Sequence, residues 1–299
     1  MRLSLAWRPI ALCRVHRLRF ASLGMTAALV GWAAAAPQPV PRMQAVPQPY
    51  EQVSFQRDGV ELARYHYGPG LKRPFVFPLN GPSGRSLTRM GHPRDPQSHS
   101  HHNSVWLSHQ NAGEVNFWED RPGPRIAHQR MQRMEDGEDS ASIEVLNAWL
   151  DKEAKTVLHE RRRLTVQALP DGEWLLLIDT QLDARDAEVI LGQTPFGLIG
   201  VRMAKTIGVH DGAGTIRNSE GGIDEIGCFR KPARWVDYSG AITPAASEGI
   251  TLLDHPRNLN HPVPFHVRND GWMGAALTFP GAHGIKPGEP LRLRYGLYV

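Results

Sequence analysis

The sequence is poor in cysteine, with only Cys13 and Cys228 among its 299 residues. Because Cys13 lies in an N-terminal segment that we expect to be removed, Cys228 would remain as a single thiol, which cannot form an intramolecular disulfide. No pair of cysteines has the spacing of a zinc site. The stability of the protein therefore has to come from a hydrophobic core, and the chain is long enough to bury one.

Beyond the N-terminus, the sequence has no basic run that would suggest binding to nucleic acid or anionic lipid. The first 35 residues contain five arginines and no acidic residue, and the apolar stretch Phe20–Ala36 follows the arginines. This order is typical of an export signal, and we place its cleavage after Ala35. Loss of the five arginines changes the formal net charge from +4 to −1. We therefore expect a periplasmic or secreted protein that binds neither nucleic acid nor, after cleavage, a membrane.

Helical periodicity is missing from the rest of the chain, and strand patterns take its place. Alternating apolar and polar residues flank Asp58 and Gly59, and a second alternating pair of runs flanks Asp171 and Gly172. Asp-Gly between such runs is a signature of a β-hairpin. Together with 24 prolines and 29 glycines, these patterns predict an all-β fold, a large antiparallel β-sandwich.

The same patterns predict the domain organisation. Residues 1–35 form the expected signal peptide. Residues 36–50 are rich in proline and glutamine and have no periodicity, which is typical of an extended linker. Residues 51–299 then form a single β-sandwich domain.

Histidines gather in two separated segments of this domain. The first segment is residues 99–109, with the side chains of His99, His101, His102, Trp106 and His109. The second segment is residues 252–271, with Asp254, His255, His261, His266 and Arg268. Because strands distant in sequence are often neighbours in a sandwich, we expect both segments to line one pocket.

The residue types in these segments favour a sugar as the ligand. Aromatic faces stack on pyranose rings, arginine and asparagine side chains bind hydroxyl groups, and histidine with a carboxylate transfers protons. A metal site is an alternative, because His99 and His101 would share one face of an extended strand and His266 or Asp254 could complete the ligand set.

The sequence resembles a bacterial domain-of-unknown-function family often labelled "PmoA, methane oxygenase". The resemblance covers about Pro74–Val299 and depends on motifs such as "HSHHNSVWLSH", "NSEGG", "RWVDYSG" and, most specifically, "LDHPRNLNHPVPFHVRNDG". Members of this family resemble β-sandwich proteins of the galactose-mutarotase type and accompany sugar oxidoreductases and hydrolases. The resemblance therefore implies a large sandwich fold and a role in carbohydrate metabolism. It does not imply methane oxidation, because the mature chain has no run long enough for a membrane span.

We interpret the chain as a protein that moves a proton at a sugar carbon or ring oxygen, without a cofactor, as in epimerisation, mutarotation or lyase chemistry. His102 and His266 are the acid–base candidates, with Glu220 or Asp254 as the paired carboxylate.

The expected binding residues surround these groups. Arg85 and Arg268 would hold an oxyanion or a uronate, and Trp106 and Trp118 would form a stacking wall. The other candidate substrate-binding residues are His101, His109 and His255.

Two other function classes fit the same residues. A non-catalytic carbohydrate-binding module would need the aromatic residues but not the histidines. A metal-dependent oxidoreductase or hydrolase would use His99, His101 and His266 as ligands. In each class the partner is a small molecule or an oligosaccharide.

Overall fold

A computed structural model describes residues 39–91 and 96–299. The expected signal peptide, residues 1–35, lies outside the described residues. Within the two described ranges, no helix has the length and apolar character needed to cross a bilayer.

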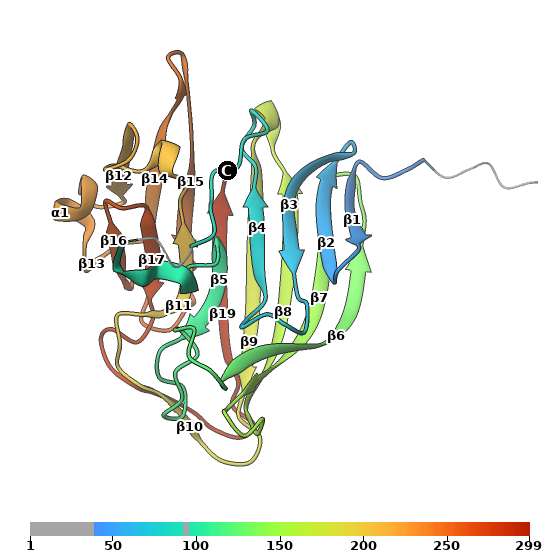
Figure 1. The fold of residues 1–299 in the computed structure, drawn as a ribbon, viewed down its shortest axis with the longest axis vertical. Coiled ribbons are helices and arrows are strands. Elements are labelled where there is room, and N and C mark those ends of the chain that lie inside the picture. The colour runs from blue at the N-terminus through green and yellow to red at the C-terminus, as the bar shows by residue number, and fades with distance from the viewer. Residues whose placement is uncertain (1–38, 92–95) are drawn as a thin grey trace, which may run out of the picture. The chain divides into compact units, whose positions relative to one another are not determined.

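Two large antiparallel sheets build the domain, which confirms the predicted all-β sandwich (Figure 1). The first sheet has nine strands, in the spatial order β1 (Met43–Gln48), β2 (Gln52–Arg57), β3 (Val60–His66), β4 (Phe75–Leu79), β5 (Val105–His109), β11 (Gly197–Arg202), β17 (Trp272–Ala276), β16 (Pro264–Arg268) and β13 (Lys231–Pro232).

The second sheet has eight strands, in the order β12 (Gly214–Asn218), β14 (Trp235–Thr243), β15 (Ala246–Asp254), β19 (Leu291–Tyr298), β9 (Trp174–Asp183), β8 (Thr156–Ala168), β7 (Ser140–Leu150) and β6 (Arg125–Glu135). A small sheet pairs β10 (Val189–Leu191) with β18 (His283–Ile285). The helical elements are short: η1 (Pro96–His101), η2 (Pro170–Gly172), η3 (Lys205–Ile207) and α1 (Asp224–Cys228).

The core lies between the two large sheets. Strand β9 alternates strictly between buried and half-buried residues, as expected for a strand with one face on a core and one toward solvent. Its buried residues Leu176 and Ile178 belong to the same apolar cluster as Val53 and Val201 of the first sheet. One continuous core therefore joins the inner faces of both sheets.

Both predicted Asp-Gly hairpins are confirmed. Asp58 and Gly59 connect β2 to β3, and both have positive φ angles, 52° and 80°. Asp171 and Gly172 connect β8 to β9 with φ angles of 56° and 86°. Two successive residues with positive φ form the turn whose twist matches that of the flanking strands.

The linker expected over residues 36–50 is wrong for part of its length. Met43–Gln48 form β1, which pairs with β2 along its whole length. Pro47 is tolerated there because β1 is the edge strand of its sheet, where one row of N–H groups needs no partner strand. The proline-rich composition therefore led to a linker prediction for residues that form a strand.

The centre of the nine-stranded sheet is buried on both faces. Every residue of β5, β11 and β17 is buried, although one face of an antiparallel sheet is often exposed to solvent. A second apolar cluster, separate from the core, covers the outer face. It consists of the aromatic side chains of Phe75, Trp106, Trp118 and Trp272. This covered outer face is where the histidine segments meet.

Candidate functional site

A cross-strand row with two glycines forms the base of the site. Trp106 on β5 pairs with Gly200 on β11, Gly200 pairs with Gly274 on β17, and Gly274 pairs with His266 on β16. A Cβ atom at Gly200 would lie 2.5 Å from the Trp106 ring, so only glycine lets the indole lie across the sheet. The row thus places Trp106 and His266 on the same face.

The next row on that face is Arg202, Trp272 and Arg268. Trp272 pairs with Arg202 of β11 on one side and with Arg268 of β16 on the other. These residues lie two positions along their strands from the glycine row, so their side chains project to the same face. This second row places the indole of Trp272 between the side chains of Arg202 and Arg268.

The strand expected for His99 and His101 is wrong, because this segment forms the 3-10 helix η1. In a 3-10 helix the side chains at positions i and i+3 eclipse each other. Accordingly His99 stacks on His102 with ring centroids 4.4 Å apart, while His101 meets His102 edge-on at 4.5 Å. The histidines therefore form one contiguous ring cluster instead of two faces of a strand.

The two histidine segments line one pocket of about 640 Å³. Its lining residues are His99, Ser100, His101, His102, Gln110, Trp118, Glu119, Asp120, Arg121, Phe196, His266, Arg268, Asp270 and Trp272. Trp272 joins the two segments, because its ring centroid lies 5.7 Å from that of His102 and 4.3 Å from that of His266.

The buried guanidinium of Arg73 fixes the pocket wall. Arg73 is 1% exposed and donates hydrogen bonds to the carbonyl of His101 and the side chain of Asn103. It also donates to the carbonyls of Phe117 and Trp118. Five donors in a rigid fork suit this role, so one cation ties η1 to the segment around Trp118.

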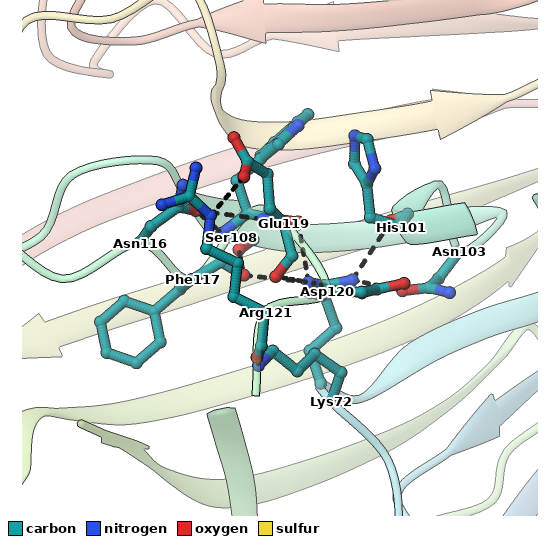
Figure 2. Close-up of polar contacts among 11 residues, drawn as sticks. Lys72, His101, Asn103, Ser108, Asn116, Phe117, Glu119, Asp120 and Arg121 are labelled. Carbon is teal, nitrogen blue, oxygen red and sulfur yellow. Dashed lines mark hydrogen bonds and ion pairs between the residues drawn. The ribbon is translucent and has the colours of Figure 1, made fainter. Parts of the chain in front are cut away.

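Two carboxylates of this segment reach the pocket. Asp120 lies 3.3 Å from Arg73, and Glu119 lies 2.6 Å from Arg121. In Figure 2 the His101 ring and the Glu119 side chain point to the same side, whereas Lys72 lies on the other. Acidic groups and an imidazole thus project from one wall.

Three histidines of the pocket are uncharged at neutral pH. Burial lowers the pKa of His101 to about 4 and that of His266 to about 3. Burial also lowers the pKa of His102 well below its usual value, and the neighbouring His101 and Arg202 lower it further. Each neutral ring offers one N–H donor and one lone pair, so the cluster can both accept a proton and donate hydrogen bonds.

Several buried ring nitrogens at the pocket have no hydrogen-bond partner in the described part of the chain. Two of them are Nδ1 of His102 and Nε1 of Trp272. Buried polar atoms in native proteins are nearly always hydrogen-bonded. These two atoms are therefore positions at which a bound hydroxyl group would improve the local hydrogen bonding.

The structure brings five of the expected site residues to this pocket. His101, His102, Trp118, His266 and Arg268 all line it. Trp106 lies directly beneath, 1% exposed, with its ring 5.2 Å from those of His102 and Trp118. Trp106 supports the pocket floor and is not the expected stacking surface.

His109, expected to bind substrate, has a structural role instead. It is fully buried, its Nδ1 accepts a hydrogen bond from the Asn111 N–H, and its Nε2 lies 2.9 Å from the Thr278 hydroxyl. Both ring nitrogens are thus occupied inside the fold.

Asp254 and His255 also lie outside the pocket lining. The segment 252–271 begins on β15 of the eight-stranded sheet and ends just after β16 of the nine-stranded sheet. The residues at its two ends therefore belong to different sheets. Asp254 is buried and lies 2.8 Å from Nδ1 of His261, and His255 accepts a hydrogen bond from the Arg257 N–H. The pair Asp254–His261 stabilises the loop.

Glu220 and Arg85 are the remaining expected residues that the structure does not place in the pocket lining. Glu220 is 60% exposed and lies 3.9 Å from Arg234. Arg85 is exposed and donates to the carbonyl of Ile242. Neither lines the pocket, so the structure does not bring these two residues to the candidate site.

The alternative metal set of His99, His101 and His266 is not supported by the arrangement. Among the residues that the structure describes, no three His, Cys, Asp or Glu side chains converge as metal ligands. The strand spacing that suggested a shared metal is replaced by ring stacking in η1.

Sequence reasoning missed several residues of the site. Trp272 and Phe196 line the pocket, and Arg73 fixes its wall. Trp272 pairs with Arg268 across the turn that joins β16 to β17, so the Asn-Asp-Gly turn signal could have placed these two residues opposite each other. Arg73 has no local signal, because its partners are distant in the sequence.

Comparison with known proteins assigns the chain to a family. A family model described as a family of unknown function (DUF6807) matches residues 52–299. No curated protein matches the chain. Because the matched range covers nearly all of the described residues, the chain belongs to DUF6807, a family of unknown function.

Proposed function

We propose that the chain is an exported protein that binds a sugar in the pocket and transfers a proton at a sugar carbon or ring oxygen. The observation that carries this proposal is the placement of His102 and His266, which pack on the same indole, Trp272. A single ligand over Trp272 would be within reach of both imidazoles. One ring would accept a proton and later return it, while the N–H of the other donates a hydrogen bond to the reacting sugar.

The walls of the pocket support a sugar as the ligand. Phe196 is half-buried and provides aromatic surface on which a pyranose ring can stack, and the nearly buried Trp118 and Trp272 lie beside it in the lining. Gln110 and Ser100 add neutral hydrogen-bonding groups. A concave site that combines aromatic surface with a few polar groups is the usual form of a small-molecule site.

The electrostatics support proton transfer by the histidines. Because burial keeps His266 uncharged, its lone pair is available at neutral pH. The carboxylate of Asp270 acts in the opposite direction and raises the pKa of His266. Asp270 would therefore stabilise the imidazolium that forms when His266 accepts a proton.

The resemblance to PmoA-like and galactose-mutarotase-type proteins adds support by analogy. The two large antiparallel sheets agree with such a fold. The N-terminal arginines and apolar stretch support export and therefore a role on sugars outside the cytoplasm.

A panel of free hexoses, pentoses and disaccharides tests the proposal. Ligand-observed NMR in D₂O would measure binding, and the same spectra would follow exchange between anomers and loss of carbon-bound protons. We expect at least one sugar to bind and to show faster anomer exchange or deuterium uptake with protein than without. Binding without either reaction would reduce the protein to a carbohydrate-binding module, and no binding by any sugar would refute the proposal.

A further inference from the structure

The charged groups that line the pocket already have partners. Five described lining residues carry a formal charge: Glu119, Asp120, Arg121, Arg268 and Asp270. Their ion pairs are Glu119–Arg121 at 2.6 Å, Asp120–Arg73 at 3.3 Å, Asp270–Arg202 at 3.1 Å and Arg268–Glu225 at 3.1 Å. Each lining charge is therefore compensated within the protein.

Two of these pairs are held by buried cations. The side chains of Arg73 and Arg202 are 0% and 2% exposed, and Arg73 is further fixed by carbonyl groups around it. A buried guanidinium cannot turn toward a ligand without leaving its carboxylate unpaired, which is costly at low dielectric. Arg73 therefore stays paired with Asp120, and Arg202 stays paired with Asp270, when a ligand binds.

An anionic ligand would have to use one of two lining cations, Arg121 or Arg268. Arg121 is already bound to Glu119. The guanidinium of Arg268 is bound to Glu225, and Glu225 also accepts a hydrogen bond from the Asn269 N–H at 2.9 Å. Sites that bind carboxylate or phosphate groups present unpaired arginine forks to the ligand. An anion at Arg268 would have to compete with Glu225 and would also face Asp270.

Three of the four lining histidines add no compensating positive charge, because burial keeps His101, His102 and His266 uncharged at neutral pH. The fourth, His99, already lies 3.6 Å from the carboxylate of Asp270. Hydroxyl groups, in contrast, can donate to the carboxylates and accept from the guanidinium groups without changing any charge balance. The pocket is thus electrically complementary to an uncharged polyol.

We propose that the pocket selects an uncharged sugar over the matching uronate, because each charged residue described in its lining is already paired. This inference rests on the proposed function, since it names the class of sugar that the same site takes. It also replaces the sequence-based expectation that Arg85 and Arg268 hold a uronate.

Matched sugars test the selection directly. The probes are glucose with glucuronate and galactose with galacturonate, because each pair differs only at C6. Isothermal titration calorimetry and ligand-observed NMR would measure the dissociation constants at pH 7.5. We expect the neutral sugar of at least one pair to bind about tenfold more tightly than its uronate. Tighter binding of the uronates would overturn this inference while supporting the proposed function, whereas no binding of any probe would overturn both.

A variant that frees Arg268 gives a second test. Glu225→Gln removes the negative charge beside Arg268 and keeps an oxygen that can accept from the Asn269 N–H. We expect uronate affinity to rise about fivefold and neutral-sugar affinity to change less than about twofold. Glu289→Gln, at an exposed position outside the pocket lining, is the matched control and should change neither affinity. An unchanged uronate affinity in Glu225→Gln would show that pairing does not set the preference and would overturn the inference.

Discussion

The imidazole of His266 packs edge-on against the indole of Trp272, with ring centroids 4.3 Å apart and planes at 77°. The contact joins two neighbouring strands, since β16 and β17 pair directly. Phe196 and Phe229 pack on the same imidazole at 5.1 and 4.9 Å. His266 is therefore held by aromatic rings, and its orientation does not depend on a charged partner.

Phenylalanine at the two acid–base positions separates chemistry from packing. His266→Phe and His102→Phe keep an aromatic ring against Trp272 but remove both ring nitrogens. We expect each variant to lower the rate of proton transfer by about 10²–10⁴-fold and to change the dissociation constant of the sugar by less than about threefold. NMR rates of anomer exchange or deuterium uptake measure the first quantity, and calorimetry measures the second.

The control for these variants is His283→Phe, since His283 lies on β18 and outside the pocket lining. Its rate should equal that of the unmodified protein. If His266→Phe and His102→Phe also kept full rates, the histidines would have no role in proton transfer.

His109 makes the stability of the protein sensitive to acid. Burial lowers its pKa to about 4, whereas an unfolded histidine has a pKa of about 6.5. Between these values the unfolded chain binds a proton that the native chain does not, so the free energy of unfolding falls as the pH decreases. From pH 7.5 to 5.5 this residue should account for about 1.4 kcal/mol of the loss.

The variant His109→Asn tests this assignment. Urea denaturation at the two pH values should show a lower stability at pH 7.5, because the bonds to Asn111 and Thr278 are lost. The further decrease on acidification should be shallower than in the unmodified protein by about 1.4 kcal/mol. Parallel pH profiles for the two proteins would contradict the role given to His109.

Arg73 should dominate the stability of the pocket wall. In Arg73→Met, Asp120 would lose its cation and several carbonyl groups would lose their donor, which should cost about 3–5 kcal/mol of unfolding free energy. The exposed Arg133, 2.5 Å from Glu135 and 66% exposed, provides the control. Arg133→Met should cost less than about 1 kcal/mol. Equal losses in denaturant titrations of the two variants would show that Arg73 is not a special anchor.

The N-terminal segment can be tested by expressing the full chain and sequencing the N-terminus of the product. Because five arginines precede an apolar run that ends in alanines, we expect the exported protein to begin at Ala36. An intact Met1 on a protein that stays in the cytoplasm would contradict the export proposal.

The sequence predicted the fold where local chemistry decides it. Asp-Gly pairs between alternating runs correctly gave the β2–β3 and β8–β9 hairpins, because both turn residues need positive φ angles. Strand β1 was missed, since an edge strand tolerates a proline that composition associates with linkers. The 3-10 helix η1 was missed because the polar segment around His99 carries no periodic signal.

The candidate site was predictable only in part, for a topological reason. Clustering correctly placed His102 and His266 in one pocket, but it also suggested Asp254 and His255. The chain between Asp254 and His266 crosses from one sheet to the other, and no local pattern reveals such a crossing. The role of Arg73 could not be predicted for a similar reason, since its partners are distant in sequence and become neighbours only in the folded domain.

A crystal structure of the protein soaked with a neutral sugar that binds in the NMR panel tests the central claim most directly. The account predicts electron density for a sugar ring in the pocket lined by Trp118, Phe196 and Trp272, with a ring nitrogen of His102 and one of His266 within about 3 Å of sugar atoms. The apolar groove formed by Leu175, Trp235, Leu253 and Tyr298 on the other sheet is the competing location. Sugar density in that groove, and none over Trp272, would contradict the account.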